Sequence, residues 1–260
     1  MLHHEISGNG KKPLVLLHGF MENTTIWEEM EAHLSKDFTL IKIDLPGHGK
    51  SKVYQEIHTV ELMAEKVKEV IDALKLEKIN LLGHSLGGYV SLAFAEKFPE
   101  ILESMTLFFS TTLADDDEKK QIRKRSIAVI DENFETFVKT SIPNLFSNNE
   151  KDILEGKIEL AKNIAKSTNK EGVKAAQLGM AERPDRTEIL ENLDAKILII
   201  AGKYDNAVKT ENLLKIIPEK TNIKTYVLDC GHNGHWEKPT ICAEIINTEL
   251  LHNLPKHFLL

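Results

Sequence analysis

The sequence predicts an α/β fold in which a mostly parallel central sheet is flanked by helices and carries a helical insertion. Short apolar runs, typical of buried parallel strands, alternate with segments of helical periodicity. The strand pattern disappears between residues 111 and 190 and then resumes. This interruption predicts one α/β domain with an insertion of helices.

The predicted strands and helices follow one another along the core. Apolar runs predict strands at residues 14–17, 39–43, 79–82, 105–109, 196–200 and 223–228. Helical periodicity predicts helices at residues 26–34, 59–74, 86–98, 210–217 and 240–251. Thr59 is the expected N-cap of the second of these helices, and Pro99 ends the third. Such alternation is typical of βαβ units, whose helices cover both faces of the sheet.

The insertion is charge-rich and helical. Its periodicity predicts helices near residues 115–130, 134–140, 151–167 and 171–182. We therefore divide the chain into a core of residues 1–110 and 191–260 and a helical cap, or lid, of residues 111–190. The acidic run at residues 115–118 is followed by two lysines, an order that favours the first turn of a solvated helix over a metal site.

The composition is that of a globular enzyme without a nucleic-acid or membrane partner. The chain has 260 residues and a formal net charge of −7, and it lacks a basic stripe with interleaved aromatic residues. It also lacks an apolar run long enough to span a bilayer and an apolar signal segment at its start, so we expect a cytoplasmic protein. Cys230 and Cys242 have neither a disulfide framework nor a zinc spacing, which predicts two reduced, packed thiols. The sequence leaves homo-oligomer formation open and indicates no function for residues 252–260.

The segment at residues 82–88 carries the clearest catalytic signal. Its Gly-x-Ser-x-Gly pattern lies between a predicted strand and a predicted helix, where a sharp turn holds a serine in a strained conformation above the sheet. Gly83 and Gly87 remove side chains that would clash across this turn. Small residues also flank serines in ordinary turns, but this strand-turn-helix context favours a nucleophile. We predict that Ser85 is the nucleophile of a serine hydrolase.

A nucleophilic serine needs a histidine that removes its proton and a carboxylate that orients the histidine. Asp205 and His232 each follow a predicted strand, and the order Ser, Asp, His along the chain accompanies this type of turn. Asp229 is a rival acid, but it immediately precedes the loop of the histidine and would have to fold back sharply. The sequence therefore predicts a triad of Ser85, Asp205 and His232.

Motifs along the whole chain resemble those of the α/β-hydrolase superfamily. The matching segments are residues 17–20, 44–51, 83–88, 202–205 and 231–239. Residues 183–185, Arg-Pro-Asp, are similar to the cap exit of the esterase and enol-lactonase-like branch. The resemblance implies an α/β-hydrolase fold with a helical cap between its sixth and seventh strands. It also implies an oxyanion hole made by the backbone N–H groups of Phe20 and Leu86, a kind of donor that stabilises developing negative charge.

The resemblance also separates two candidate histidines. In the family the catalytic histidine is followed by a glutamate and then a proline, and Glu237 and Pro239 stand in these places after His232. His235 is then expected in a loop near the mouth of the pocket. We place five residues at the substrate pocket, namely Met21, His84, Tyr89, His235 and Trp236. His18 and His84 flank the oxyanion hole and the nucleophile, and we expect both to hydrogen-bond to the backbone.

The sequence supports three other functions less well. Residues 47–51 end like a phosphate-binding loop, but Asp44 stands where its first glycine belongs and would repel phosphate. A lyase of menaquinone synthesis is similar in several motifs, but it carries an arginine where this chain has Tyr89. A ligand receptor without catalysis is a third hypothesis. We expect hydrolysis of a small, largely uncharged carboxylic ester or lactone, with no cofactor and no metal.

Overall fold

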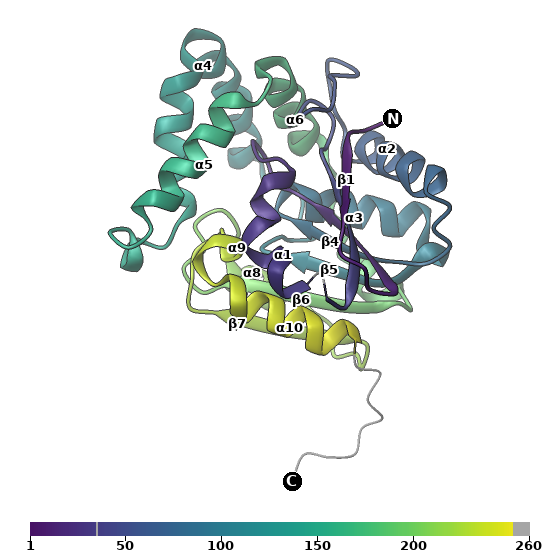
Figure 1. Ribbon diagram of the computed structural model, residues 1–260. Coiled ribbons are helices and arrows are strands. Elements are labelled where there is room, and N and C mark those ends of the chain that lie inside the picture. The colour runs from purple at the N-terminus through teal and green to yellow at the C-terminus, as the bar shows by residue number, and fades with distance from the viewer. Residues whose placement is uncertain (35, 252–260) are drawn as a thin grey trace.

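A seven-stranded sheet forms the centre of the protein (Figure 1). The computed structural model describes residues 1–34 and 36–251, so the tail at residues 252–260 lies outside the described residues. The strands are β1 His4–Ser7, β2 Lys12–Leu17, β3 Phe38–Ile43, β4 Ile79–His84, β5 Leu102–Phe108, β6 Lys196–Gly202 and β7 Ile223–Leu228. Their order across the sheet is β1-β3-β2-β4-β5-β6-β7, and all neighbours pair in parallel except β1 and β3.

The predicted α/β fold with its mostly parallel sheet flanked by helices is confirmed, and all six predicted strands are present. Strand β1 was missed. It has four residues, it lies at the edge of the sheet, and none of its side chains is fully buried. A strand of this kind lacks the apolar run by which the other strands are recognised.

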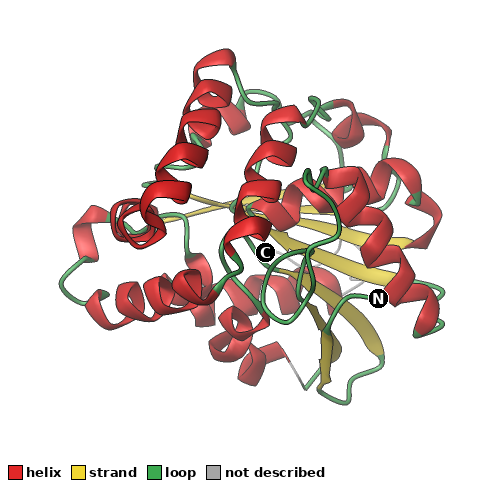
Figure 2. Cartoon of the chain, turned by 90° about the horizontal axis from the view of Figure 1, so that it is seen from above, coloured by secondary structure: helices red, strands yellow, loops and turns green. Residues whose placement is uncertain are grey.

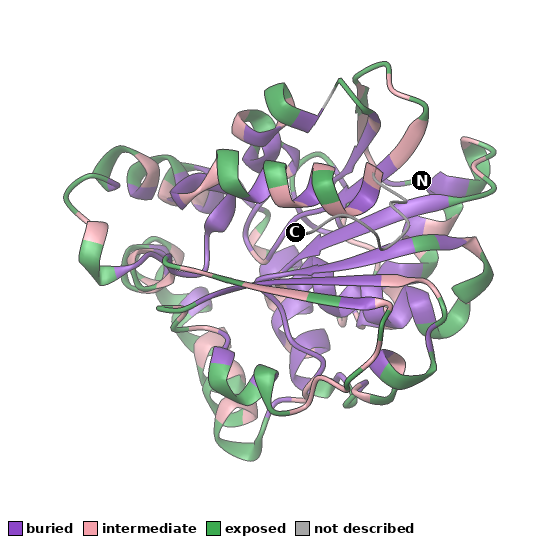
Figure 3. Ribbon diagram, turned by 90° about the horizontal axis from the view of Figure 1, so that it is seen from below, coloured by how far each residue is buried: buried purple, intermediate pink, exposed green. Residues whose placement is uncertain are grey.

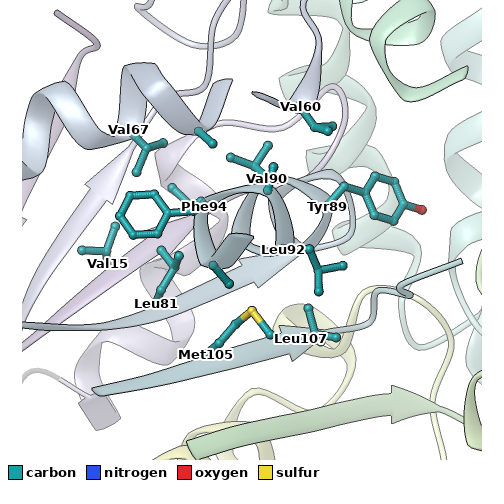
Figure 4. Close-up of a cluster of buried hydrophobic side chains, with 14 of the residues drawn as sticks. Val15, Val60, Val67, Leu81, Tyr89, Val90, Leu92, Phe94, Met105 and Leu107 are labelled. Atoms are coloured by element: carbon teal, nitrogen blue, oxygen red, sulfur yellow. The ribbon is translucent and has the colours of Figure 1, made fainter. Parts of the chain in front are cut away.

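Helices cover both faces of the sheet, as Figure 2 shows from above. Helices α2 Val60–Ala73 and α3 Leu86–Lys97 lie against one face, and α1 Glu28–Leu34 and α10 Pro239–Leu251 lie against the other. Side chains alternate between the two faces of a strand. In β2, Val15 and Leu17 therefore share a core with α2 and α3, whereas Leu14 and Leu16 share a core with α1 and α10. Figure 4 shows the first of these cores, with Phe94 of α3 beside Val15.

The ends of the core helices follow local sequence signals. The Thr59 side chain accepts a hydrogen bond from the Leu62 N–H (3.1 Å), which confirms the predicted N-cap of α2. Helix α3 ends at Lys97, two residues before Pro99. Cys230 and Cys242 are buried free thiols. None of the helices described combines the length and the apolar character that crossing a bilayer requires.

Three longer helices follow β5 and precede β6, namely α4 Asp117–Ser141, α5 Glu155–Ser167 and α6 Lys170–Glu182 (Figure 1). Helix α4 contains a break at Asn133 (φ −155°, ψ 86°), which corresponds to the boundary between the two helices predicted there. Figure 3 shows that this part of the chain carries many exposed residues, whereas the central strands are buried. The division of the chain into core and cap stays a prediction.

The expected position of the insertion in the sheet needs a correction. We expected it between the sixth and seventh strands, but the described chain has five strands before it, so it lies between the fifth and the sixth. The helices occur where expected along the sequence. Only the strand count differs, because the resemblance implied one strand more before the insertion than the chain forms.

Candidate active site

The carboxyl ends of β4, β6 and β7 bring the three predicted catalytic side chains to one edge of the sheet. Ser85 follows β4 directly, and Asp205 and His232 lie in the loops after β6 and β7. Nδ1 of His232 lies 2.7 Å from Oδ2 of Asp205, and both side chains are buried. Since a carboxylate can only accept, His232 carries its Nδ1 proton toward Asp205, and Nε2 is the free nitrogen. Ser85 and His232 line the same cavity.

The structure separates the two candidate acids by their direction. The other carboxylate oxygen of Asp205 accepts hydrogen bonds from the N–H groups of Ala207 (2.7 Å) and Val208 (2.9 Å), which hold it facing the histidine. The Asp229 side chain is 74% exposed and pairs with Lys203 (3.2 Å). Asp229 therefore points into solvent, and the structure brings Asp205 to His232.

Ser85 sits in a strained turn. Its φ of 50° and ψ of −110° place it where residues other than glycine are rare, and α3 begins with the next residue. The Ser85 N–H donates to the Phe108 carbonyl (3.0 Å), which ties the turn to β5. A Cβ atom on Gly83 would collide with the carbonyl of Gly87, and one on Gly87 would collide with the carbonyl of Leu17. Close backbone approach is thus what requires both glycines.

The predicted oxyanion donors lie in the loop after β2 and at the start of α3. Leu86 is the first residue of α3, so its N–H has no acceptor within the helix. His18 Nδ1 donates to the Gly19 carbonyl (2.7 Å), and His18 Nε2 accepts from the Leu45 N–H (2.9 Å). Because a trans peptide unit is planar, the anchored Gly19 carbonyl fixes the Phe20 N–H in the opposite direction. His18 hydrogen-bonds to the backbone as expected and so orients one donor.

Comparison with known proteins agrees with this geometry. A family model described as the α/β hydrolase fold matches residues 12–239, a range that includes Ser85, Asp205 and His232. The chain belongs to the α/β-hydrolase family. Its three predicted catalytic residues stand in the order and at the strand ends that the family motif requires.

Relatives of this α/β-hydrolase span nearly its whole length. A Bacillus subtilis (strain 168) protein that carries the name "Putative 2-succinyl-6-hydroxy-2,4-cyclohexadiene-1-carboxylate synthase" is 28% identical over 256 residues, with 92% of this chain and 90% of that protein covered. A thermophilic esterase from Thermogutta terrifontis, solved with malate bound, has a TM-score of 0.91 at 32% identity and covers 96% of this chain and 93% of its own. The enol-lactonase from Burkholderia xenovorans LB400 has a TM-score of 0.89 at 20% identity, with 96% of each chain covered. The predicted resemblance to esterases and enol-lactonases of the family is confirmed.

A cavity of about 560 Å³ lies in front of Ser85. Met21, His84 and Tyr89 line it, as expected. Its other apolar lining residues include Phe20, Leu113, Ile122, Phe137, Leu145, Met180 and Val208. The cavity therefore has apolar walls from both the loops of the core and the helices that follow β5.

Two of the predicted pocket residues lie elsewhere. His235 is fully buried in the short helix α9 Gly234–Glu237, and Trp236 stacks on Phe146 with the ring planes 8° apart (centroids 6.0 Å). Neither lines the cavity, so the prediction of a loop histidine at the pocket mouth was wrong. The reason is Glu237, whose carboxylate accepts from the N–H groups of Gly231 (2.8 Å) and Asn233 (3.2 Å). These bonds wind the segment into a helical turn that directs both rings inward.

The buried glutamate Glu22 was not predicted from the sequence. Glu22 contacts His84 (Nδ1 to Oε2, 2.8 Å), so His84 bonds to a side chain as well as to the backbone. The one signal is the position of an acid directly after the apolar pair Phe20 and Met21, three residues beyond Gly19. Among residues 1–34 and 36–251, Glu22, His84 and His235 are the one group with metal-ligand spacing. Both nitrogens of His84 already face acceptors, so a proton, and not a metal ion, accounts for the contacts of this histidine.

Part of the cavity lining is charged. Asp115 is fully buried between Arg123 and Arg183, and Nη2 of Arg183 lies 2.9 Å from its carboxylate. Burial raises the pKa of Asp115, but the two arginines outweigh it and hold that pKa below its ordinary value of 3.8. The Arg183 guanidinium also lies over the Tyr89 ring, 3.9 Å from its centroid. Asp117 and Glu118 of the acidic run lie in the first turn of α4, as predicted, and Asp116 is its N-cap, whereas Asp115 precedes the helix and is buried.

Proposed function

We propose that this α/β-hydrolase cleaves a small carboxylic ester, or a lactone, through an acyl-enzyme on Ser85. One observation carries the proposal. A strained serine at the end of β4 shares a cavity with a histidine whose Nδ1 is held by a buried carboxylate, which leaves Nε2 free to take a proton. This arrangement suits acyl transfer, in which a weak hydroxyl nucleophile must lose its proton as it attacks.

In the first half of the proposed reaction, Ser85 Oγ attacks the carbonyl carbon of the substrate. Nε2 of His232 accepts the hydroxyl proton, and Asp205 stabilises the imidazolium that forms. The N–H groups of Phe20 and Leu86 donate to the developing oxyanion, and each donor of this kind contributes about 3 kcal/mol. The tetrahedral intermediate then collapses, and His232 gives its proton to the departing alkoxide.

In the second half, water replaces the alcohol. His232 takes a proton from that water, the resulting hydroxide attacks the acyl-enzyme, and the acid leaves as Ser85 regains its proton. Every proton and electron pair in this sequence moves between Ser85, His232, water and the ester.

The cavity supports a substrate that has both apolar and polar groups. Apolar side chains such as Phe20, Met21 and Leu145 line it together with charged ones such as Asp115 and Arg123. A volume of about 560 Å³ suits a small molecule. The similarity to the Thermogutta esterase and the Burkholderia enol-lactonase supports an ester or a lactone over other acyl compounds.

A lyase is the second candidate, because of a single contact. The sequence argues against it since Tyr89 replaces the arginine of the lyases, yet Arg183 lies over the Tyr89 ring and supplies a guanidinium in that place. The Bacillus relative carries the name of a synthase. Arg183 is, however, already paired with Asp115 and donates to the carbonyls of Met180 (2.7 Å) and Leu113 (3.0 Å), so few of its donors are left for a substrate. This engagement favours the hydrolase.

Covalent labelling tests the proposal. A fluorophosphonate should label the wild-type protein once, and peptide mapping should place the label on Ser85, with Ser85→Ala as the unlabelled control. Turnover should then be measured on p-nitrophenyl esters of graded chain length, on a lactone and on the lyase substrate. Label on another residue, or rapid turnover of the lyase substrate alone, contradicts the proposal.

A further inference from the structure

A series of hydrogen bonds joins two loops through the last residue of β4, next to the predicted nucleophile. The Gly19 N–H donates to Oε2 of Glu22 (2.5 Å), and Nδ1 of His84 lies 2.8 Å from the same oxygen. The other ring nitrogen of His84, Nε2, lies 3.1 Å from the carbonyl oxygen of His232. The chain of bonds thus runs from the loop after β2, through the last residue of β4, to the loop after β7.

The side chains of Glu22 and His84 form a buried ion pair. A backbone carbonyl only accepts, so Nε2 of His84 carries a proton, and a carboxylate that accepts from a backbone N–H is stabilised in its ionised form. His84 is therefore an imidazolium with Glu22 as its counter-ion. Burial lowers the pKa of His84, but the Glu22 carboxylate outweighs it and raises that pKa above its ordinary value. Burial raises the pKa of Glu22, but His84 lowers it to about 2.

The surroundings of His84 make this counter-ion important. The titratable groups that face it are Glu22, His18, Asp205, His232 and His235. The His235 ring lies 4.7 Å away, edge-on, and burial together with the charge of His84 lowers the pKa of His235, so it stays neutral. The His232 ring lies 5.0 Å from the His84 ring. Without the Glu22 carboxylate, His84 would be a buried cation without a counter-ion.

We propose that Glu22 and His84 are positioning residues, and that together they form a strut holding the oxyanion loop and the His232 loop in place around Ser85. The role rests on the proposed hydrolase function. Neither side chain needs to touch the reacting atoms. The strut acts through the Gly19 N–H at one end and the His232 carbonyl at the other, and it carries no net charge.

The position of these loops matters because the reaction depends on small distances. The oxyanion donors act only when they meet the oxyanion at hydrogen-bond length, and a misplacement of about 1 Å can cost about 10²-fold in rate. Both side chains also line the cavity, but their bonds hold the catalytic loops, so a loosened strut should lower kcat more than it changes KM.

The first test replaces one oxygen of the strut. Glu22→Gln should lower kcat about 10²-fold, and the loss of kcat should exceed any change in KM. The matched control is Glu61→Gln on α2, which removes the charge from another ion pair, because Glu61 pairs with the buried Arg186 (2.6 Å) and does not line the cavity. Glu61→Gln should lower thermal stability and leave kcat at the wild-type value.

Two substitutions of His84 cut the strut at opposite ends. The amide nitrogen of His84→Asn takes the place of Nδ1 and keeps the Glu22 contact, whereas that of His84→Gln takes the place of Nε2 and keeps the His232 contact. If the strut works as a unit, both variants lose kcat about as much as Glu22→Gln, and Glu22→Gln/His84→Asn loses no more than either single variant. Additive losses would mean that the two side chains act separately.

A spectroscopic measurement checks the ion pair without any activity assay. In ¹⁵N-labelled wild-type protein at pH 7, both ring nitrogens of His84 should give the shifts of protonated nitrogens, and Glu22→Gln should remove this signature. A neutral His84 in the wild type, or a wild-type kcat in Glu22→Gln, overturns the strut. Should Glu22→Gln fail to fold, the wild-type spectrum and the two His84 variants decide. Failure of Ser85 to take the fluorophosphonate overturns the proposed function and leaves the spectrum unaffected, so the two failures are distinguishable.

Discussion

Helices α3 and α4 are held in this protein in two different ways. Ten of the twelve residues of α3 are buried, since it lies between the sheet and α2. Only two of the twenty-five residues of α4, Ile130 and Val138, are buried. Helix α4 packs through a few apolar side chains, and ion pairs add to its attachment, among them the contacts of Asp131 with Lys170 (3.5 Å) and Lys174 (2.9 Å) at the start of α6.

The two helices differ in how precisely their atoms are held in position. Close packing fixes atoms to a fraction of an ångström, and α3 begins directly after Ser85. Exposed ion pairs contribute at most about 1 kcal/mol each and tolerate movement. We therefore expect substitutions at the end of the sheet to change kcat, and substitutions in the helices after β5 to change KM and stability.

The largest expected effect lies on the closely packed side. Ser85→Ala should lower kcat about 10⁶-fold, because the acyl-enzyme can no longer form. Ile122→Ala, in the cavity wall formed by α4, should keep kcat within about 3-fold and change mainly KM, since it alters one apolar contact. Steady-state kinetics on one p-nitrophenyl ester measures kcat and KM of both variants. A large loss of kcat in Ile122→Ala would contradict the expected difference between α3 and α4.

The next effect concerns the orienting acid. Asp205→Asn should lower kcat about 10⁴-fold, since an amide at this place no longer fixes the tautomer of His232. Asp229→Asn removes a similar charge from the same end of the sheet, but its side chain faces solvent, so its rate should stay at the wild-type value. If the two variants exchanged these results, Asp229 would be the acid.

A substitution at Asp115 tests whether exposed ion pairs alone stabilise the helices that follow β5. Asp115→Asn leaves two arginines without their buried partner and should lower the free energy of unfolding by about 3 kcal/mol, a large effect for this region. Because the arginines lower the pKa of Asp115, its contribution is present above its ordinary value of 3.8 and is lost as the pH falls through the folded-state pKa. Urea unfolding at several pH values should show a weaker acid dependence in the variant. An equal dependence in both proteins would remove Asp115 from this role.

The last comparison concerns two glycines, one in α5 and one in α3, and it includes the smallest expected change in stability. A side chain on Gly156 of α5 would meet no atom within 4 Å, so Gly156→Ala should stabilise the protein by about 0.5 kcal/mol through its higher helix propensity. Gly87→Ala should destabilise it by about 3 kcal/mol, because the added Cβ would collide with the backbone of β2. Thermal unfolding measures both changes. A stable Gly87→Ala variant would mean that the turn around Ser85 is less tightly packed than the structure indicates.

The sequence determined the features that depend on neighbours along the chain. The strand-turn-helix signal placed Ser85, and the apolar runs placed six strands whose carboxyl ends meet at one edge of the sheet. The break in α4 at Asn133 also followed from local periodicity. Strand β1 escaped because an edge strand pairs through its backbone and needs no apolar pattern.

Tertiary structure alone decided which way the side chains face. Asp205 and Asp229 follow adjacent strands, and only the hydrogen bonds of their loops turn one toward His232 and the other to solvent. His235 turned inward because the Glu237 carboxylate winds its segment into a helix. The contact of Glu22 with His84 joins residues 62 positions apart. The sequence pattern specifies periodicity and turns, whereas side-chain direction and long-range pairing depend on how distant segments pack, and packing exists only in the folded chain.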